Sequence, residues 1–145
     1  MDDLELAKNE LKTQDLTLVI AKAGEIIFKT NDHKIAGFLS AIEKFGQFLE
    51  GSSIADRVVG KAIALLCVYA KIKAIYAKVI STKAKKVLEQ NQISHEWASI
   101  VNEILDLKTN QVCPFEMKAM ELSDPKITYF ELRNLLNSLK NCKHS

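Results

Sequence analysis

The chain has 145 residues, of which 48% are hydrophobic and 26% are charged, enough to build the core of a single domain over residues 1–145. Its net charge of +2 is too small to indicate a nucleic acid or an anionic membrane as a partner. The longest apolar run, from Ala62 to Ala70, is shorter than the roughly 18–20 residues that span a bilayer. Composition therefore excludes a membrane-spanning protein and favours an ordinary globular one.

The cysteines and the start of the chain indicate a reducing compartment. Cys67, Cys113 and Cys142 are odd in number and far apart, which predicts free thiols instead of a disulfide framework. Residues 1–15 are charged and amphipathic, unlike a secretory signal. We therefore expect a cytoplasmic protein.

The first thirty residues predict a helix followed by a β-hairpin. Apolar residues at helical spacing indicate a helix over residues 1–14. Apolar, β-branched runs at 16–21 and 25–30 predict two strands. Ala23-Gly24 between them is a tight-turn signal, because glycine accepts a positive φ at little cost.

Two helices are predicted next, over residues 35–49 and 57–70. Asp32 and Asp56 stand where each helix would start, and an aspartate there can cap free backbone N–H groups. The body of the second helix is apolar on every face. It should therefore be buried, against a sheet and under another helix.

The middle of the chain predicts a third strand at 75–80, a lysine-rich helix at 83–90 and a short fourth strand at 94–97. Apolar spacing then suggests a short helix over 100–105. Residues 109–112 are either a polar loop or a last strand.

The end of the chain predicts two helices separated by a proline break. The first covers 113–122, and Pro125 follows it. The second covers 126–142 and carries a capping box, Thr128 with Glu131 three residues on. This order of elements predicts an α/β fold, a three-layer α/β/α sandwich whose mixed sheet opens with a β-hairpin.

Two short motifs resemble those of a small prokaryotic family known as a domain of unknown function. They are Ser53 to Ala62 (SIADRVVGKA) and Cys113 to Glu116 (CPFE). The opening helix, the hairpin over 16–28 and the AKVIS segment over 77–81 resemble the same family. The resemblance extends from about Leu4 to Pro125. It implies a cytidine-deaminase-like fold and no established activity.

The zinc chemistry of deaminases requires a His or Cys ligand, a Glu two residues later and a following Pro-Cys-x-x-Cys. In that fold the first ligand lies at the start of the helix before the third strand. This sequence has Asp56 in place of the His or Cys ligand, and Val58 in place of the Glu two residues later. The Cys pair would lie at the start of the helix that follows the third strand. Residues 82–86, where that helix begins, contain no cysteine. Zinc prefers thiolate and imidazole ligands in structural and catalytic sites. We therefore predict no metal and no other cofactor.

The three histidines, His33, His95 and His144, have no second ligand at a metal-binding spacing. His95-Glu96 also lacks the second His of a helical zinc motif. We interpret all three as exposed or hydrogen-bonded side chains.

The first candidate cluster lies at the start of the predicted helix over 57–70. Asp56 is either a plain cap or a residue that donates or accepts a proton. Gly60 would lie inside a buried helix, so a neighbouring backbone or a ligand should approach it closely. Arg57 and Lys61 would share one helix face near a positive helix end. They mark either solvent contact or an anion-binding site.

The second candidate cluster is Cys113 with Glu116. Pro114 suits the first position of a helix, which puts Cys113 at the cap. A helix N-terminus stabilises a thiolate, so Cys113 is a candidate reactive thiol. Glu116 could close back on the backbone N–H of Cys113. The alternative is a capping turn with an inert thiol.

Two functions fit these clusters. In the first, Asp56, Cys113 and Glu116 are catalytic and Arg57, Gly60 and Lys61 bind a phosphorylated or nucleotide-like small molecule without zinc. The second is a non-catalytic binding or regulatory domain that kept the fold and lost the chemistry. The lysines from Lys71 to Lys86 have little aromatic interleaving, so nucleic acid is disfavoured as a partner. Assembly into a homo-oligomer stays open.

Overall fold

A computed structural model describes residues 2–32, 35–105 and 112–142 of the chain. Its centre is a five-stranded sheet in the order β2-β1-β3-β4-β5. β1 pairs antiparallel with β2 and β3, and β3, β4 and β5 run parallel. The strands are β1 (Leu18–Lys22), β2 (Glu25–Thr30), β3 (Ser53–Val59), β4 (Ala74–Ser81) and β5 (Ser94–Val101).

The opening hairpin is as predicted. Ala23 and Gly24 form the turn with φ angles of 52° and 81°, in the left-handed region where glycine carries no steric cost. Both of their N–H groups donate to the carboxylate of Asp3, over 3.1 and 2.8 Å. The first helix therefore holds the turn from outside the sheet.

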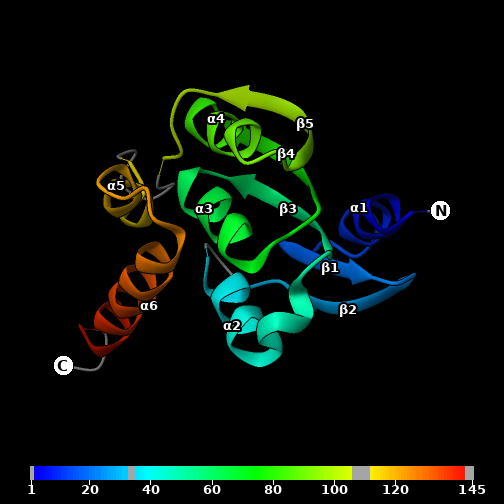
Figure 1. Ribbon diagram of the computed structural model, residues 1–145, viewed down its shortest axis with the longest axis horizontal. Helices are drawn as coiled ribbons and strands as arrows, with labels where there is room; N and C mark the ends of the chain where they lie inside the picture. Colours follow the sequence, from blue (N-terminus) through cyan, green and yellow to red (C-terminus); the bar gives the residue numbers. More distant parts are fainter. Residues whose placement is uncertain (1, 33–34, 106–111, 143–145) are drawn as a thin grey trace.

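One face of the sheet is covered by α1 (Asp3–Thr13), as Figure 1 shows. Asp2 caps this helix by accepting from the Glu5 N–H over 2.8 Å. The residues of α1 at helical spacing pack on small and aromatic side chains of β1, β3 and β4. This second core cluster contains Leu4, Ala7, Leu11, Val19, Ala21, Ala55, Ala74 and Tyr76.

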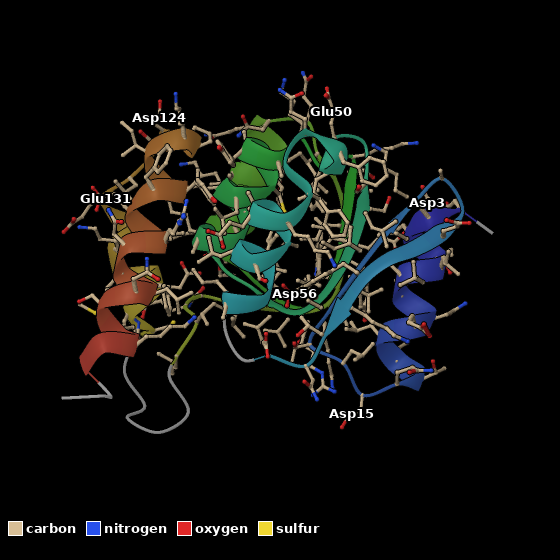
Figure 2. The ribbon with its side chains drawn as sticks, turned by 90° about the horizontal axis from the view of Figure 1, so that it is seen from below. Asp3, Asp15, Glu50, Asp56, Asp124 and Glu131 are labelled. Atoms are coloured by element: carbon tan, nitrogen blue, oxygen red, sulfur yellow. The ribbon has the colours of Figure 1, made fainter. Side chains whose placement is uncertain are left out.

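The opposite face carries α2 (Ala36–Phe45), a 3₁₀ turn η1 (Gly46–Leu49), α3 (Lys61–Ala70) and α4 (Thr82–Gln90). α5 (Pro114–Met120) and α6 (Pro125–Cys142) pack beyond them against α3. α3 is thus enclosed on several sides, as its all-apolar sequence predicts. The α/β/α sandwich with a mixed sheet is confirmed, with α5 and α6 lying outside the helical layer in Figure 2.

Two elements and one helix cap differ from the predictions. Residues 53–59 form the central strand β3, so the helix predicted over 57–70 begins at Lys61. β5 continues to Val101, so no helix covers 100–105. Ile35, not Asp32, holds the cap position of α2 and makes no side-chain cap bond. Of the segment predicted over 109–112, only Val112 lies within the described residues, where it bridges to Leu105.

α6 begins before its predicted capping box. The Asp124 carboxylate accepts from the Ile127 N–H over 2.9 Å, which makes Asp124 the residue that caps this helix. Thr128 lies inside the first turn, and its hydroxyl donates to the Asp124 carbonyl over 2.7 Å. The capping box predicted from Thr128 and Glu131 is therefore wrong. Within the described ranges, no helix has the length and apolar character needed to cross a membrane.

Candidate functional site

The candidate site lies where two neighbouring parallel strands end. β3 leads into α3 through Gly60, and β4 leads directly into α4. Both helices start at the same edge of the sheet, because parallel strands place their carboxyl ends together. Each start presents backbone N–H groups that lack partners within the helix and carries partial positive charge. In open α/β sheets this edge is where ligands bind.

A buried carboxylate from α5 occupies the start of α3. Oε2 of Glu116 accepts a hydrogen bond from the Ala62 N–H over 3.2 Å. Glu116 is 8% exposed, and this burial raises the pKa of its carboxyl. Hydrogen bonds from the N–H groups of Ala62 and Lys61, and the charges of Lys83 and Lys61, oppose that increase in pKa.

Gly60 is the residue that lets this carboxylate approach. A β-carbon at position 60 would occupy the place where Oε1 of Glu116 lies, and it would also touch Ile104. The φ of Gly60 is −101°, which any residue can adopt, so its role is to leave space. The close approach predicted at Gly60 is confirmed, and the group that approaches is the Glu116 side chain.

A small pocket adjoins Glu116. Its free volume is about 10 Å³, roughly the room that one water molecule needs. The Ser81 hydroxyl at its edge caps α4 by accepting from the Ala84 N–H over 3.1 Å. The residues around the pocket are Ser81, Lys83, Asn102, Glu103, Ile104, Val112, Glu116 and Met120.

Three of the six residues predicted for the site come together. Gly60, Lys61 and Glu116 meet at the start of α3, although Glu116 is separated from Ala62 by 54 positions in the chain. Sequence reasoning did not include Ser81 and Lys83. Both stand at the start of the helix that follows β4, so the position of that helix start was the signal that could have identified them.

Asp56 lies elsewhere, and the prediction that it caps a helix is wrong. It sits on β3 opposite Leu18 of β1 and Ala77 of β4. Figure 2 shows it inside the molecule between the sheet and α2. Burial raises the pKa of its carboxyl to about 7, against hydrogen bonds from the Val58 and Arg57 N–H groups.

Arg57 lies on β3 and does not share a helix face with Lys61, so the shared face predicted for that pair is wrong. Its Nε donates to the Leu16 carbonyl over 2.6 Å, and its guanidinium pairs with the exposed carboxylate of Asp15. Arg57 thus fastens β3 to the segment that precedes β1.

Cys113 holds the cap position of α5, as predicted, with Pro114 at the first helical position. Its N–H donates to the Ile104 carbonyl over 3.0 Å, so the return bond predicted from Glu116 does not form. Cys113 is 8% exposed, and among the described residues it is not one that surrounds the pocket. Cys67 lies in the core within α3, and burial raises the pKa of its thiol.

The residues at these helix starts do not fit zinc. Gly60 and Lys61 lie at the start of α3, Ser81 and Lys83 lie at the start of α4, and two carboxylates among the described residues, Glu116 and Glu103, border the pocket beside them. An ammonium group repels a cation, and zinc sites take most of their ligands from His and Cys, neither of which stands at these helix starts. No group of three His, Cys, Asp or Glu side chains suited to a metal occurs among the described residues.

Of the three histidines, only His95 lies in the described ranges. Its Nδ1 is 2.8 Å from the Ile93 carbonyl, and its ring stacks on Trp97. This agrees with the interpretation of His95 as a hydrogen-bonded side chain. His33 and His144 lie outside the described residues.

The fold and the site define a class: an α/β sandwich with a buried carboxylate at the ends of two parallel strands. The family model described as a domain of unknown function, DUF1893, matches residues 6–136, and the chain belongs to this family. The family predicted from the two motifs is therefore confirmed. Among curated proteins, none matches the chain.

Two kinds of solved structure are similar to this chain. The DUF1893 family protein TM1506 from Thermotoga maritima is 29% identical, with a TM-score of 0.81 over 94% of this chain and 89% of that chain. The dCMP deaminase from cyanophage S-TIM5 in apo form is 13% identical, with a TM-score of 0.48 over 68% and 94%. The same deaminase in complex with dCMP and dUMP has a TM-score of 0.45 at 13% identity, over 65% and 92%. This second likeness concerns the fold only.

Proposed function

We propose that the protein binds, or acts on, an anionic small molecule at the starts of α3 and α4, without zinc. The molecule would be phosphorylated or nucleotide-like. The observation that carries the proposal is the Glu116 carboxylate held by the Ala62 N–H, 3.2 Å away. It supports the idea that this helix start can hold an anionic group in a buried setting.

Lys61 and Lys83 supply the charge that such a ligand needs. Both act on the carboxylate of Glu116, since the charge of each lowers its pKa. A phosphate or carboxylate group of a ligand would receive the same attraction. Because the free volume is about 10 Å³, the ligand can enter only if the Glu116 side chain moves away.

Two alternative roles for Glu116 follow, and a single substitution distinguishes between them. Glu116→Gln keeps the shape of the side chain and removes its charge. If Glu116 only competes with the anionic group, this variant binds the ligand more tightly. If Glu116 moves a proton of the bound molecule, the variant binds it but does not convert it.

The test is a thermal-shift screen with nucleotides and sugar phosphates, because a ligand that binds only the folded protein raises the Tm. Lys61→Gln combined with Lys83→Gln should abolish the shift. Lys86→Gln is the matched control, since Lys86 lies exposed on α4 and does not border the pocket. A shift that survives the double substitution places the ligand elsewhere.

The second candidate, a non-catalytic binding or regulatory domain that takes no such ligand at this site, is favoured by the small volume of the pocket. In that case Glu116 is structural and joins α5 to α3. No nucleotide or sugar phosphate would then raise the Tm of the protein or of Glu116→Gln. A screen in which no compound changes the Tm would favour this candidate over the first.

A further inference from the structure

β5 is the most exposed strand of the sheet. Seven of its eight residues are exposed, and His95 alone is half-buried. Three large apolar side chains lie open to solvent on it: Trp97 at 38%, Ile100 at 44% and Val101 at 37%. A parallel strand of an α/β protein is normally covered on both faces. β5 therefore lacks the cover that the other parallel strands of the sheet have.

β5 also leaves one edge of the sheet open. It pairs with β4 on one side, and no described helix or strand lies beyond it in Figure 1. The other edge strand, β2, carries Glu25 and Lys29, and its pairing with β1 shifts register. Charges and bulges protect sheet edges against added strands. From Trp97 to Val101, β5 has neither a charged residue nor a proline.

We propose that β5 pairs antiparallel with β5 of a second copy of this chain, around a two-fold axis at Ser99. The two sheets would then form one continuous ten-stranded sheet. This register sets Trp97 opposite Val101 of the second copy and Ala98 opposite Ile100. Aromatic and β-branched pairs across strands are among the stabilising ones.

The charges around β5 favour a second copy over a charged partner strand. Glu96, the acidic residue of β5, is already paired with Lys8 of α1 over 2.8 Å. In the proposed register Glu96 and His95 fall outside the five central residues of each strand. The five central residues of each strand therefore bring no charge into the new pairing, where like charges directly opposite would be destabilising. The nearby ammonium of Lys85 comes from α4 and lies over the face of the Trp97 ring, 5.1 Å from the ring centre.

Sedimentation and the fluorescence of Trp97 test the proposal together, because Trp97 is the one tryptophan of the chain. We expect a dimer, with the emission of Trp97 shifting to shorter wavelength as the protein concentration rises. Ser99→Lys sets two lysines against each other at the axis and should yield monomers with exposed Trp97. Ser94→Lys, at the outer end of β5, is the matched control and should stay dimeric.

A crosslinking experiment keeps the proposal testable if Ser99→Lys unfolds the chain, since Ser99 Oγ contacts the Lys78 carbonyl at 3.4 Å. Ser99→Cys should form a disulfide-linked dimer under mild oxidation, and Ser94→Cys should not. A wild-type protein that sediments as a monomer throughout would overturn the proposal. So would a dimer that survives Ser99→Lys, or equal crosslinking of both cysteine variants.

Discussion

The Asp56 carboxyl lies on the central strand β3, and its ionisation should govern how stability depends on pH. Its pKa is about 7 in the folded protein and near 3.8 when the chain is unfolded. Between these values the folded protein holds a proton that the unfolded chain has released. Raising the pH therefore favours unfolding, and the effect stops above pH 7.

We predict that stability falls by up to about 4 kcal/mol between pH 4 and pH 7, from a shift of roughly three pKa units. Asp56→Asn keeps an oxygen that can accept from the Val58 N–H and should remove most of this dependence. Urea denaturation at several pH values measures it. Asp32→Asn, at an exposed residue, is the control and should leave the slope unchanged.

Gly60 and Glu116 should behave as one unit in stability measurements. Gly60→Ala would push the Glu116 carboxylate away from the Ala62 N–H and leave buried polar groups without partners. We expect a loss of about 1–3 kcal/mol. In a Glu116→Ala background the same Gly60→Ala change should cost much less, because the space is then free. Equal costs in both backgrounds would contradict the contact.

At the scale of elements, the start of α6 offers a test of which residue is the cap. Asp124→Ala removes the bond to the Ile127 N–H and should cost about 0.5–2 kcal/mol. Ser123→Ala, one residue earlier, is the control and should be close to neutral. Chemical denaturation measures the free energy of unfolding of the two variants. Equal stability of both would show that Asp124 does not cap the helix.

Strong periodicity made most elements predictable, whereas β3 and the end of β5 were not. In β3 the apolar residues Ile54, Ala55, Val58 and Val59 fit helical as well as strand spacing, and Asp56 is a residue that strands disfavour. Burial of the strand between two neighbours decides its conformation. The end of β5 lacks any buried face, so no alternation marked it as a strand.

The candidate site was predicted in two separate halves. The motif around Gly60 and the Cys113-Pro114-Phe115-Glu116 turn were both identified from the sequence. Their meeting depends on how α5 packs on α3, which is a long-range contact that no local pattern encodes. Asp56 and Arg57 lie away from the site, because the residues that carry them form the strand β3 and not the predicted helix start.

For the whole molecule, the donor atoms at the site predict a protein that holds no stoichiometric zinc. Protein purified in zinc-containing buffer and then desalted should contain no zinc by elemental analysis. Its Tm should not change when a chelator is added, because a chelator destabilises only a protein whose folding depends on a bound metal. One tightly held zinc per chain would contradict this prediction and the zinc-free proposal with it.

The contact between Gly60 and Glu116 has a consequence for the evolution of the family. A side chain at position 60 and a glutamate at position 116 compete for the same space, so the two positions cannot vary independently. Relatives in which alanine or a larger residue replaces Gly60 should carry a shorter side chain than glutamate at 116. Where glutamate is retained there, the other position should be glycine.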